Sequence, residues 1–369
     1  MQQTDTNEPP VPLETTIDER QLAILPLAKY SVIIDARTPL EYADDHVPGA
    51  VNLPVVEQQE FAEVGTLHRR DPHRAYVVGA AYALRCIAGH IETVVSAYKP
   101  TDHILVYCFR GGKRSRLWGD ILRAIGFNVD VLSGGWKAYR QWVASGLERL
   151  IPTLRFHVIA GSTGSGKTRL LKALEAKGAQ VLDLEAIAGH RGSVLGAVPG
   201  LAQPSQKRFE SLLFDRLRKF SSDQVVWIES ESRMIGRIHL PRSLYEAICA
   251  APASVLSASL EDRVLLLHED YRHLLADLHG MVDKLQHIAA EVVGRKEIIE
   301  WRTLADQCDS RELFRRMMER YYDPLYARAS RKNLRMLEVA NRVSMPALDD
   351  GCVRAVAEQL IARECGLLG

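Results

Sequence analysis

The first part of the chain alternates short apolar runs with longer helical patterns. The apolar runs at residues 32–34 and 103–108 have the length of buried strands. Residues 57–99 and 115–126 carry apolar side chains at helical spacing, and a glycine closes the second of these patterns. Alternation of this kind predicts a small, mostly parallel sheet flanked by helices.

The alternation starts again after the segment Leu-Ile-Pro-Thr-Leu at residues 150–154. Four further strands are predicted, at residues 155–161, 180–184, 223–230 and 255–260. After about residue 262 the apolar positions follow helical spacing alone, so we expect no strand there. The whole pattern predicts two α/β domains followed by a helical C-terminal region.

Composition narrows the class of protein without deciding its function. Of 369 residues, 47% are hydrophobic and 25% are charged, and the net charge of +1 gives no global field that would commit the protein to nucleic acid. Residues 1–16 are polar, acidic and proline-bearing, which predicts a flexible tail and not a targeting leader. No run approaches the ~20 apolar residues of a membrane span, and the six cysteines are scattered as reduced thiols would be. We therefore expect a cytoplasmic protein with no membrane partner.

A cysteine ends the predicted strand at residues 103–108 and begins the loop Cys-Phe-Arg-Gly-Gly-Lys-Arg-Ser, residues 108–115. A glycine-rich turn followed by a helix aims backbone N–H groups at one point, which stabilises a thiolate and any anion it carries. Cys108 is therefore the candidate nucleophile. The loop residues expected to hold an anion around it are Arg110, Gly111, Gly112, Lys113 and Arg114.

Residues 20–145 resemble a rhodanese domain. The likeness rests on Asp35 and Arg37, on Glu41, and on the segment HVPGAVNLP at residues 46–54. It implies that Cys108 carries sulfur or selenium, and that Asp35, Arg37 and His46 belong to the scaffold. Five residues separate Cys108 from Arg114, whereas the common rhodanese loop has four, so a phosphatase-like activity and a larger anion both stay open.

A second glycine-rich loop follows the predicted strand at residues 155–161 and precedes a helical pattern. It satisfies the P-loop pattern, in which backbone N–H groups and a lysine bind phosphates and a hydroxyl can ligate Mg²⁺. The pattern does not say which polyphosphate binds. The predicted diphosphate-binding residues are Gly161, Ser162, Thr163, Gly164, Ser165, Gly166, Lys167 and Thr168.

Polar clusters follow the next two predicted strands, at residues 183–193 and 229–236. Carboxyl ends of parallel strands beside a P-loop face the ligand, so these side chains are expected to support it. Mg²⁺ is the one candidate metal, held through Thr168 and Glu229. The supporting residues are predicted to be Asp183, Glu185, His190, Arg191, Glu229, Glu231 and Arg233.

Residues 311–342 hold nine Arg or Lys against four acids, with the aromatic segment YYDPLY at 321–326 among them. Interleaved cations and aromatic rings suit a folded RNA, although a solvated basic helix face would give the same composition. The candidate tRNA-binding residues are Arg315, Arg316, Arg320, Tyr321, Tyr322, Arg328, Arg331 and Lys332.

The motifs CFRGGKRS, GSTGSGKT, DLEAIAGHRGS and WIESESRMIG, in this order, resemble the bacterial tRNA 2-selenouridine synthases. The likeness covers nearly the whole chain and implies four parts. These are a flexible tail at 1–16, a rhodanese-like α/β domain at 17–148, a P-loop NTPase-like α/β domain at 152–262, and a helical C-terminal region at 263–369 that is the candidate tRNA-binding part.

The resemblance also implies an activity. Such an enzyme replaces the sulfur of wobble 2-thiouridine in tRNA with selenium, through S-geranyl-2-thiouridine, and uses geranyl diphosphate and selenophosphate as co-substrates. It has no tightly bound cofactor beyond the candidate Mg²⁺. Its partners are a tRNA with a wobble 2-thiouridine and the enzyme that supplies selenophosphate.

Two other functions fit the same motifs. One is a rhodanese-type sulfurtransferase coupled to an ATP-dependent P-loop kinase or ATPase, and the other is a non-enzymatic tRNA-binding regulator. The apolar helices after residue 262 could hold a geranyl chain, although apolar helix faces more often form a core.

Overall fold

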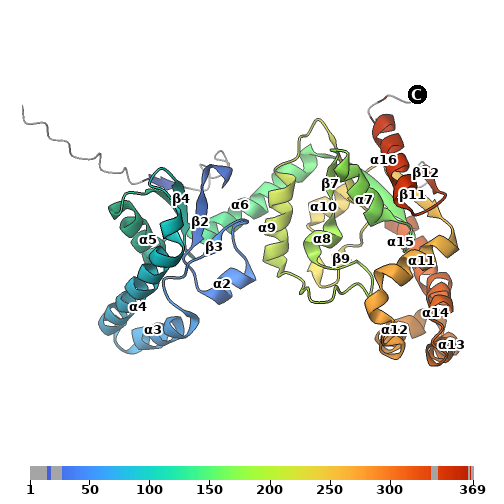
Figure 1. The fold of residues 1–369 in the computed structure, drawn as a ribbon, viewed down its shortest axis with the longest axis horizontal. Coiled ribbons are helices and arrows are strands. Elements are labelled where there is room, and N and C mark those ends of the chain that lie inside the picture. Colours follow the sequence, from blue (N-terminus) through green and yellow to red (C-terminus); the bar gives the residue numbers. More distant parts are fainter. Residues whose placement is uncertain (1–14, 18–26, 334–339, 365, 367–369) are drawn as a thin grey trace, which may run out of the picture. The chain divides into compact units, whose positions relative to one another are not determined.

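The computed structural model describes residues 15–17, 27–333, 340–364 and 366, with the backbone alone for 15–17 and 329–333. The chain forms two compact units: residues 1–146 together with 210–212, and residues 147–209 together with 213–369 (Figure 1). Among the described residues, no helix combines the length and the apolar character that crossing a membrane would need. Each unit is described on its own below.

The first unit contains a five-stranded, fully parallel sheet in the order β1-β5-β4-β2-β3, which confirms the predicted parallel sheet. Its strands are β1 (Thr15–Ile17), β2 (Val32–Asp35), β3 (Val51–Asn52), β4 (His103–Tyr107) and β5 (Asn128–Leu132). β1 takes in two residues of the segment predicted as a tail, because Thr15 and Thr16 pair with β5; residues 1–14 lie outside the described part.

Helices surround this sheet and bury its apolar residues. They are η1 (Leu27–Lys29), α2 (Pro39–Asp44), α3 (Gln58–Arg70), α4 (Pro72–Thr93), η2 (Val95–Ala97), α5 (Lys113–Ala124) and α6 (Gly135–Leu150). The predicted helical stretch at 57–99 is thus two helices. Asp71 ends α3 and caps α4 by accepting a hydrogen bond from the backbone N–H of Arg74, and Pro72 occupies the first turn of α4, where its missing N–H costs nothing.

The second unit is built on another parallel five-stranded sheet, in the order β12-β11-β6-β8-β7. Its strands are β6 (Arg155–Gly161), β7 (Gln180–Leu182), β8 (Val225–Glu229), β11 (Ala253–Ala258) and β12 (Asn341–Met345). The four predicted strands are confirmed. The prediction of no strand after residue 262 is wrong, because β12 returns to pair in parallel with β11 at the sheet edge.

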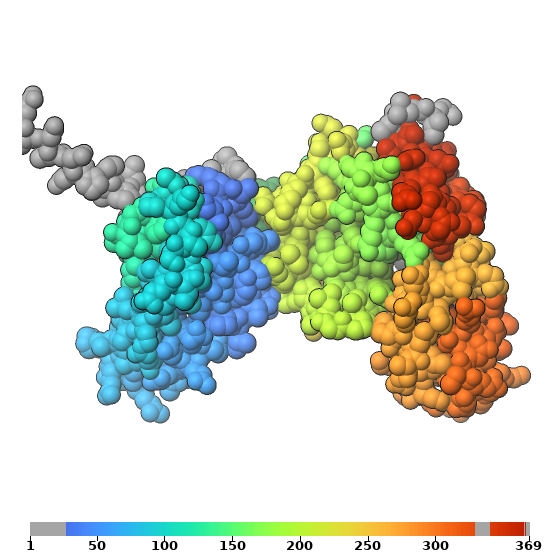
Figure 2. All heavy atoms as spheres, in the orientation of Figure 1, coloured from blue at the N-terminus to red at the C-terminus, as the bar shows by residue number. Residues whose placement is uncertain are grey.

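Helices also cover this second sheet, and a short hairpin lies beside them. These elements are η3 (Ile151–Thr153), α7 (Lys167–Ala176), α8 (Leu184–Ala188), α9 (Gln206–Leu217), β9 (Met234–Ile235), β10 (Ile238–His239), α10 (Arg242–Ala250) and α16 (Asp350–Glu364). The last helix, α16, packs against α7 through Leu170, Leu174, Val356 and Ala357, although the two are far apart in sequence (Figures 1 and 2). The C-terminus therefore completes the P-loop domain.

Between β11 and β12 the chain forms the predicted helical region, seen as the orange mass in Figure 2. It comprises α11 (Leu260–Asp270), η4 (Arg272–Leu274), α12 (Leu278–Val293), α13 (Arg295–Asp306), α14 (Ser310–Met317), the π-helix η5 (Met318–Tyr322) and α15 (Asp323–Asn333). Its core is apolar and continuous, with Trp301, Met317 and Tyr321 fully buried.

Candidate functional site

The cysteine loop leaves the end of β4 and enters α5, as predicted. Cys108 is buried, and the Ser115 hydroxyl donates a hydrogen bond to its Sγ at 3.2 Å. α5 begins at Lys113, so the positive end of its dipole lies beside the sulfur. Ser115 was missing from the predicted site, although its position one helical turn into α5 could have indicated it.

Glycines outside the motif fix this loop. Gly135, at φ 57°, lies so close that an added Cβ would stand 2.1 Å from the Cys108 carbonyl oxygen. The backbone N–H of Trp136 donates to that same carbonyl at 2.7 Å. The start of α6 therefore holds the cysteine loop in place, and no side chain larger than hydrogen fits at Gly135.

Cations surround the mouth of the loop. Arg114 donates two hydrogen bonds to Glu41, at 2.7 and 3.2 Å. Burial works against ionisation of Glu41, but these bonds outweigh it and lower the pKa of that carboxyl. Arg110 and Lys113 are exposed, and neither forms an ion pair within the described part of the chain. The loop thus keeps free positive charge for an anion.

Asp35 and Arg37 are buried at the end of β2, as expected for residues with a structural role. They form a buried ion pair, and the Tyr107 hydroxyl donates to Asp35 at 2.7 Å. His46 stacks on the ring of Tyr42 with centroids 3.8 Å apart. These contacts fix the polar corner at the end of β2.

The second loop has the predicted strand before it and the predicted helix after it. Gly164 and Gly166 adopt positive φ angles of 76° and 87°. The Lys167 ammonium donates to the carbonyl oxygens of Gly161 at 2.8 Å and Ser162 at 3.4 Å, so it lies folded across the loop. The backbone N–H of Gly161 donates to the Tyr326 hydroxyl at 2.7 Å. The positive φ angles and the lysine at the start of α7 are those of a P-loop.

The P-loop opens into a cavity of about 590 Å³. Residues 163–169 line it, together with Lys172, Glu185, Arg191 and Glu231. The helical region contributes residues that are mostly apolar or aromatic, namely Leu266, Leu267, Tyr271, Tyr321, Tyr322, Leu325 and Tyr326. The cavity therefore joins a phosphate-binding loop to a hydrocarbon-like wall.

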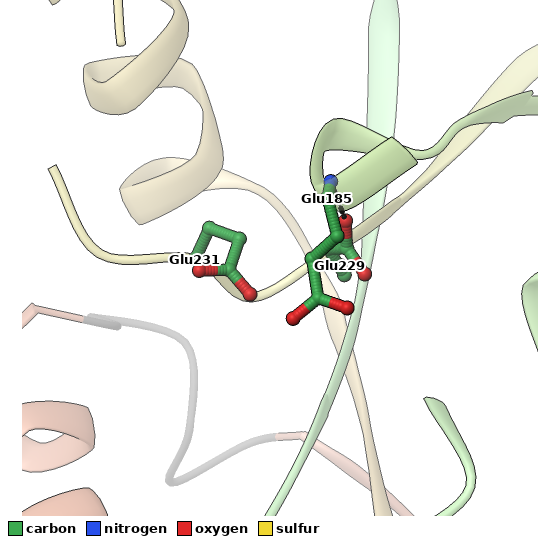
Figure 3. A group of neighbouring side chains, drawn as sticks. All are labelled: Glu185, Glu229 and Glu231. Atoms are coloured by element: carbon green, nitrogen blue, oxygen red, sulfur yellow. Dashed lines mark hydrogen bonds between the residues drawn. The ribbon is translucent and has the colours of Figure 1, made fainter. Parts of the chain in front are cut away.

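Three carboxylates meet beside the P-loop (Figure 3). One oxygen from each of Glu185, Glu229 and Glu231 lies within 4.8 Å of the others. Glu229 ends β8 with no exposed surface; its Oε1 accepts from the Glu185 N–H at 2.8 Å, while its Oε2 has no partner in the described structure. A Cβ on Gly192 would stand 2.9 Å from both other carboxylates, so glycine makes room for the cluster.

Burial controls the charge of these carboxylates. It raises the pKa of Glu185 to about 8 and that of Glu231 to about 7, and it raises the pKa of Glu229 as well. Repulsion between the carboxylates adds to the rise at Glu185 and Glu229, whereas Lys167 opposes it at Glu185 and Glu231. Without a cation, the cluster therefore favours bound protons near neutral pH.

The remaining supporting residues are more spread out. The Arg191 guanidinium lies 5.1 Å from the Tyr271 ring centroid at the cavity wall, and it donates to the Asp270 carbonyl. Asp183 caps α8 by accepting from the Ala186 N–H at 2.8 Å. His190 and Arg233 do not line the cavity; burial lowers the pKa of His190, and Arg233 is exposed.

Several site residues were not among those predicted. Buried Arg263 donates to the Thr163 carbonyl of the P-loop at 3.0 Å and forms a bidentate pair with Asp323, so it ties the P-loop to the helical region. Tyr271 bonds to Ser193 across 3.0 Å. The sequence could have indicated Arg263, because this arginine interrupts an otherwise apolar helix face. No feature of the sequence indicated Tyr271.

The candidate tRNA-binding residues do not form one free surface. Arg315 pairs with Glu261, and Arg316 pairs with Glu297. Tyr321 is 2% exposed and belongs to the helical core, and both Tyr321 and Tyr322 line the P-loop cavity. Arg320 and Arg328 are exposed, and the side chains of Arg331 and Lys332 lie outside the described part. Binding of tRNA here stays a prediction.

The fold and the two loops define a class: a cysteine-loop domain of rhodanese type fused to a P-loop α/β domain. Residues 20–141 match the family described as "Rhodanese-like domain", and residues 154–292 match "tRNA 2-selenouridine synthase AAA domain". The chain is also similar along most of its length to curated proteins named tRNA 2-selenouridine synthase.

The protein from Alcanivorax borkumensis is 31% identical, over 80% of this chain and 88% of its own length. The one from Pseudomonas fluorescens is 32% identical, over 80% of this chain and 87% of its own length. The one from Aeromonas salmonicida is 29% identical, over 90% and 95% of the two chains. This chain belongs to the tRNA 2-selenouridine synthase family and is an enzyme of that type.

Proposed function

We propose that this enzyme replaces the sulfur of wobble 2-thiouridine in tRNA with selenium, through an S-geranyl intermediate. One observation carries the proposal: a single cavity combines a P-loop with an apolar, aromatic wall. Such a cavity suits a ligand with a diphosphate at one end and a hydrocarbon chain at the other. Geranyl diphosphate is that ligand.

In the first step, the thiocarbonyl sulfur attacks the carbon of the geranyl group that bears the diphosphate. The new C–S bond forms as the C–O bond breaks, diphosphate leaves with the electron pair, and the N3 proton of the base passes to water. Lys167, which donates to loop carbonyls in the structure, and the loop amides would turn to the departing diphosphate and stabilise its negative charge. Leu267 and Tyr322 would hold the chain.

In the second step, geranylthiol leaves C2 of the base as selenium adds there. Alkylation matters because it converts a poor leaving group into a thiol. Selenophosphate supplies the selenium and, with one water molecule, ends as inorganic phosphate. Selenium stays at the selenide level throughout: its bond to phosphorus breaks as water takes the phosphoryl group, and its bond to C2 forms as the C2–S bond to geranylthiol breaks. We assign Cys108 to hold the selenium in this exchange without an S–Se bond, which would need an oxidant, with Arg110 and Lys113 beside the incoming anion.

Mg²⁺ fits the carboxylate cluster next to the P-loop. Buried Glu229 Oε2 lacks a partner, and carboxylate oxygens are the ligands that Mg²⁺ prefers. To the expected ligands Thr168 and Glu229 the cluster adds Glu185 and Glu231. When bound, the ion would shield diphosphate charge.

The proposal is tested on thiolated tRNA with geranyl diphosphate and selenophosphate, by mass spectrometry of the digested nucleosides. Cys108→Ala should abolish 2-selenouridine while S-geranyl-2-thiouridine still forms. Lys167→Ala should lose the geranylated nucleoside. Product formation that requires stoichiometric ATP hydrolysis would reject the diphosphate role of the P-loop and favour the coupled kinase or ATPase.

A further inference from the structure

Six exposed arginine and lysine side chains lie on or near the Cys108 loop. The proposed mechanism does not assign them a common function. Three lie at the tip of the α3–α4 hairpin and three on the loop and the start of α5. We call them the hairpin–loop surface; they are Arg69, Arg70, Arg74, Arg110, Lys113 and Arg116.

The positive charges of these six side chains are not neutralised by neighbouring carboxylates in the described structure. None of the six forms an ion pair with any residue in the described ranges, and all six are exposed. In the C-terminal helices, Arg315 and Arg316 are neutralised by Glu261 and Glu297, whereas Arg311, Arg320 and Arg328 are exposed and form no ion pair within the described ranges. The hairpin–loop surface differs in that its cations lie beside the loop that carries Cys108.

Exposed aromatic rings connect the hairpin to the loop. The ammonium of Lys113 lies 3.6 Å from the ring centroid of Tyr76, which is 52% exposed. The ring of His68 stands edge-on to that of Tyr76, with the ring centroids 5.4 Å apart. Phe61, 43% exposed, lies under the Arg114 guanidinium at 5.5 Å. These contacts connect the hairpin to the mouth of the loop through Tyr76 and Phe61. Arg70 and Arg74 line the adjacent groove between α3 and α4, which also holds Glu63.

We propose that the hairpin–loop surface binds RNA and presents an unpaired base to Cys108. This rests on the proposed function, in which a tRNA base must reach that sulfur. Single-stranded RNA is recognised by cations on its phosphates and by aromatic rings that stack on its splayed bases. The surface offers both chemistries at the edge of the loop that carries the nucleophile, with Tyr76 as the stacking platform.

The test compares two variants of the full-length protein that each lose three exposed arginines. One carries Arg69→Ala, Arg70→Ala and Arg74→Ala, and its control carries Arg272→Ala, Arg295→Ala and Arg311→Ala in the C-terminal helices, at exposed arginines outside the candidate tRNA-binding set. Fluorescence anisotropy gives the Kd for thiolated tRNA at several salt concentrations. The hairpin variant should bind at least tenfold more weakly, and its slope of log Kd against log salt should fall by about 2, since each lost phosphate contact removes roughly 0.7–0.9. The control should bind like the wild type.

A second pair separates stacking from folding. Tyr76→Ala should weaken tRNA binding, whereas Tyr76→Phe, which keeps the aromatic face, should not. Circular dichroism melting shows whether each variant is folded. If the triple alanine variant is unfolded, the variant with Arg69→Lys, Arg70→Lys and Arg74→Lys takes its place; it keeps the charge and should keep the salt slope of the wild type.

Each outcome has its own meaning. If the wild type binds no tRNA, the proposed function fails. If the wild type binds tRNA and the hairpin variant binds equally well, or if only the C-terminal control weakens, the surface assignment is overturned. Equal affinity of the wild type for heparin and for tRNA, with no effect of Tyr76→Ala, would reduce the surface to a general polyanion site and overturn it as well.

Discussion

At the scale of single residues, Ser115 lies against the sulfur of Cys108, although it was not among the predicted site residues. Its hydroxyl donates to Cys108 Sγ at 3.2 Å, and a thiolate gains more from such a bond than a thiol does. Ser115→Ala should therefore slow alkylation of Cys108 by iodoacetamide roughly fivefold, as expected from the loss of about 1 kcal/mol. Labelled peptides read by mass spectrometry give the rate for Cys108 separately from the other thiols. An unchanged rate would remove Ser115 from the site.

A second prediction at this scale follows from the buried Oε2 of Glu229, which has no hydrogen-bond partner in the described structure. The full-length protein should bind Mn²⁺, used as a probe for Mg²⁺, in the absence of any substrate, and chelation should remove it. Glu229→Gln should abolish this binding because the neutral amide cannot replace a buried anionic ligand.

Electron paramagnetic resonance of free Mn²⁺ measures the binding directly, without an activity assay. Glu291→Gln, a change at an exposed glutamate on α12, is the matched control and should bind as the wild type does. Retained Mn²⁺ binding in Glu229→Gln would place the ion elsewhere.

At the scale of elements, the helical region supplies one wall of the P-loop cavity. Tyr322 comes from the π-helix η5 and Leu267 from α11, and Arg263 ties this wall to the P-loop through Thr163 and Asp323. Tyr322→Ala should weaken the binding of geranyl diphosphate by about ten- to a hundredfold, the loss expected for 1.5–3 kcal/mol of apolar contact. Inorganic diphosphate should bind with unchanged affinity, because it does not reach the wall.

Isothermal titration calorimetry of both ligands, with Tyr322→Phe as the conservative variant, checks this. If Tyr322→Ala loses both ligands equally, the residue supports the P-loop and not the hydrocarbon chain. If the wild type itself binds the two ligands equally, the prenyl assignment of the cavity fails.

The elements that were predicted correctly are those fixed by local pattern. Buried parallel strands such as β4 and β6 are continuous apolar runs, and their glycine-rich loops are legible in a single sequence. β12 was missed because an edge strand needs no such run: Arg342 and Ser344 of this strand are exposed, and only Met345 is fully buried. Its pairing with β11 is a contact across more than eighty residues, which no local pattern reports.

At the scale of the molecule, the two loops were predictable and the cavity was not. Each loop lies within one strand–turn–helix unit, whereas the cavity joins P-loop residues to side chains about a hundred or more residues later, such as Leu267 and Tyr322. The same limit explains the tRNA prediction, since charge density in sequence does not show that Arg315 and Arg316 already have acidic partners. The sequence therefore predicted the two glycine-rich loops, whereas the residues that contact them from distant parts of the chain could be identified only from the tertiary structure.

Because Cys108 and Lys167 lie in different units of the chain, the two steps should be separable. S-Geranylated tRNA made by Cys108→Ala can be purified and given to Lys167→Ala together with selenophosphate. The second protein retains the cysteine loop with its Ser115 and Gly135 contacts, none of which involves the P-loop, so it should convert the intermediate to 2-selenouridine at close to the wild-type rate. Nucleoside mass spectrometry follows the conversion, and Cys108→Ala in the second step is the negative control. Failure of Lys167→Ala on the purified intermediate would mean that selenation also needs an intact P-loop, and that the chain does not divide its chemistry between the two units.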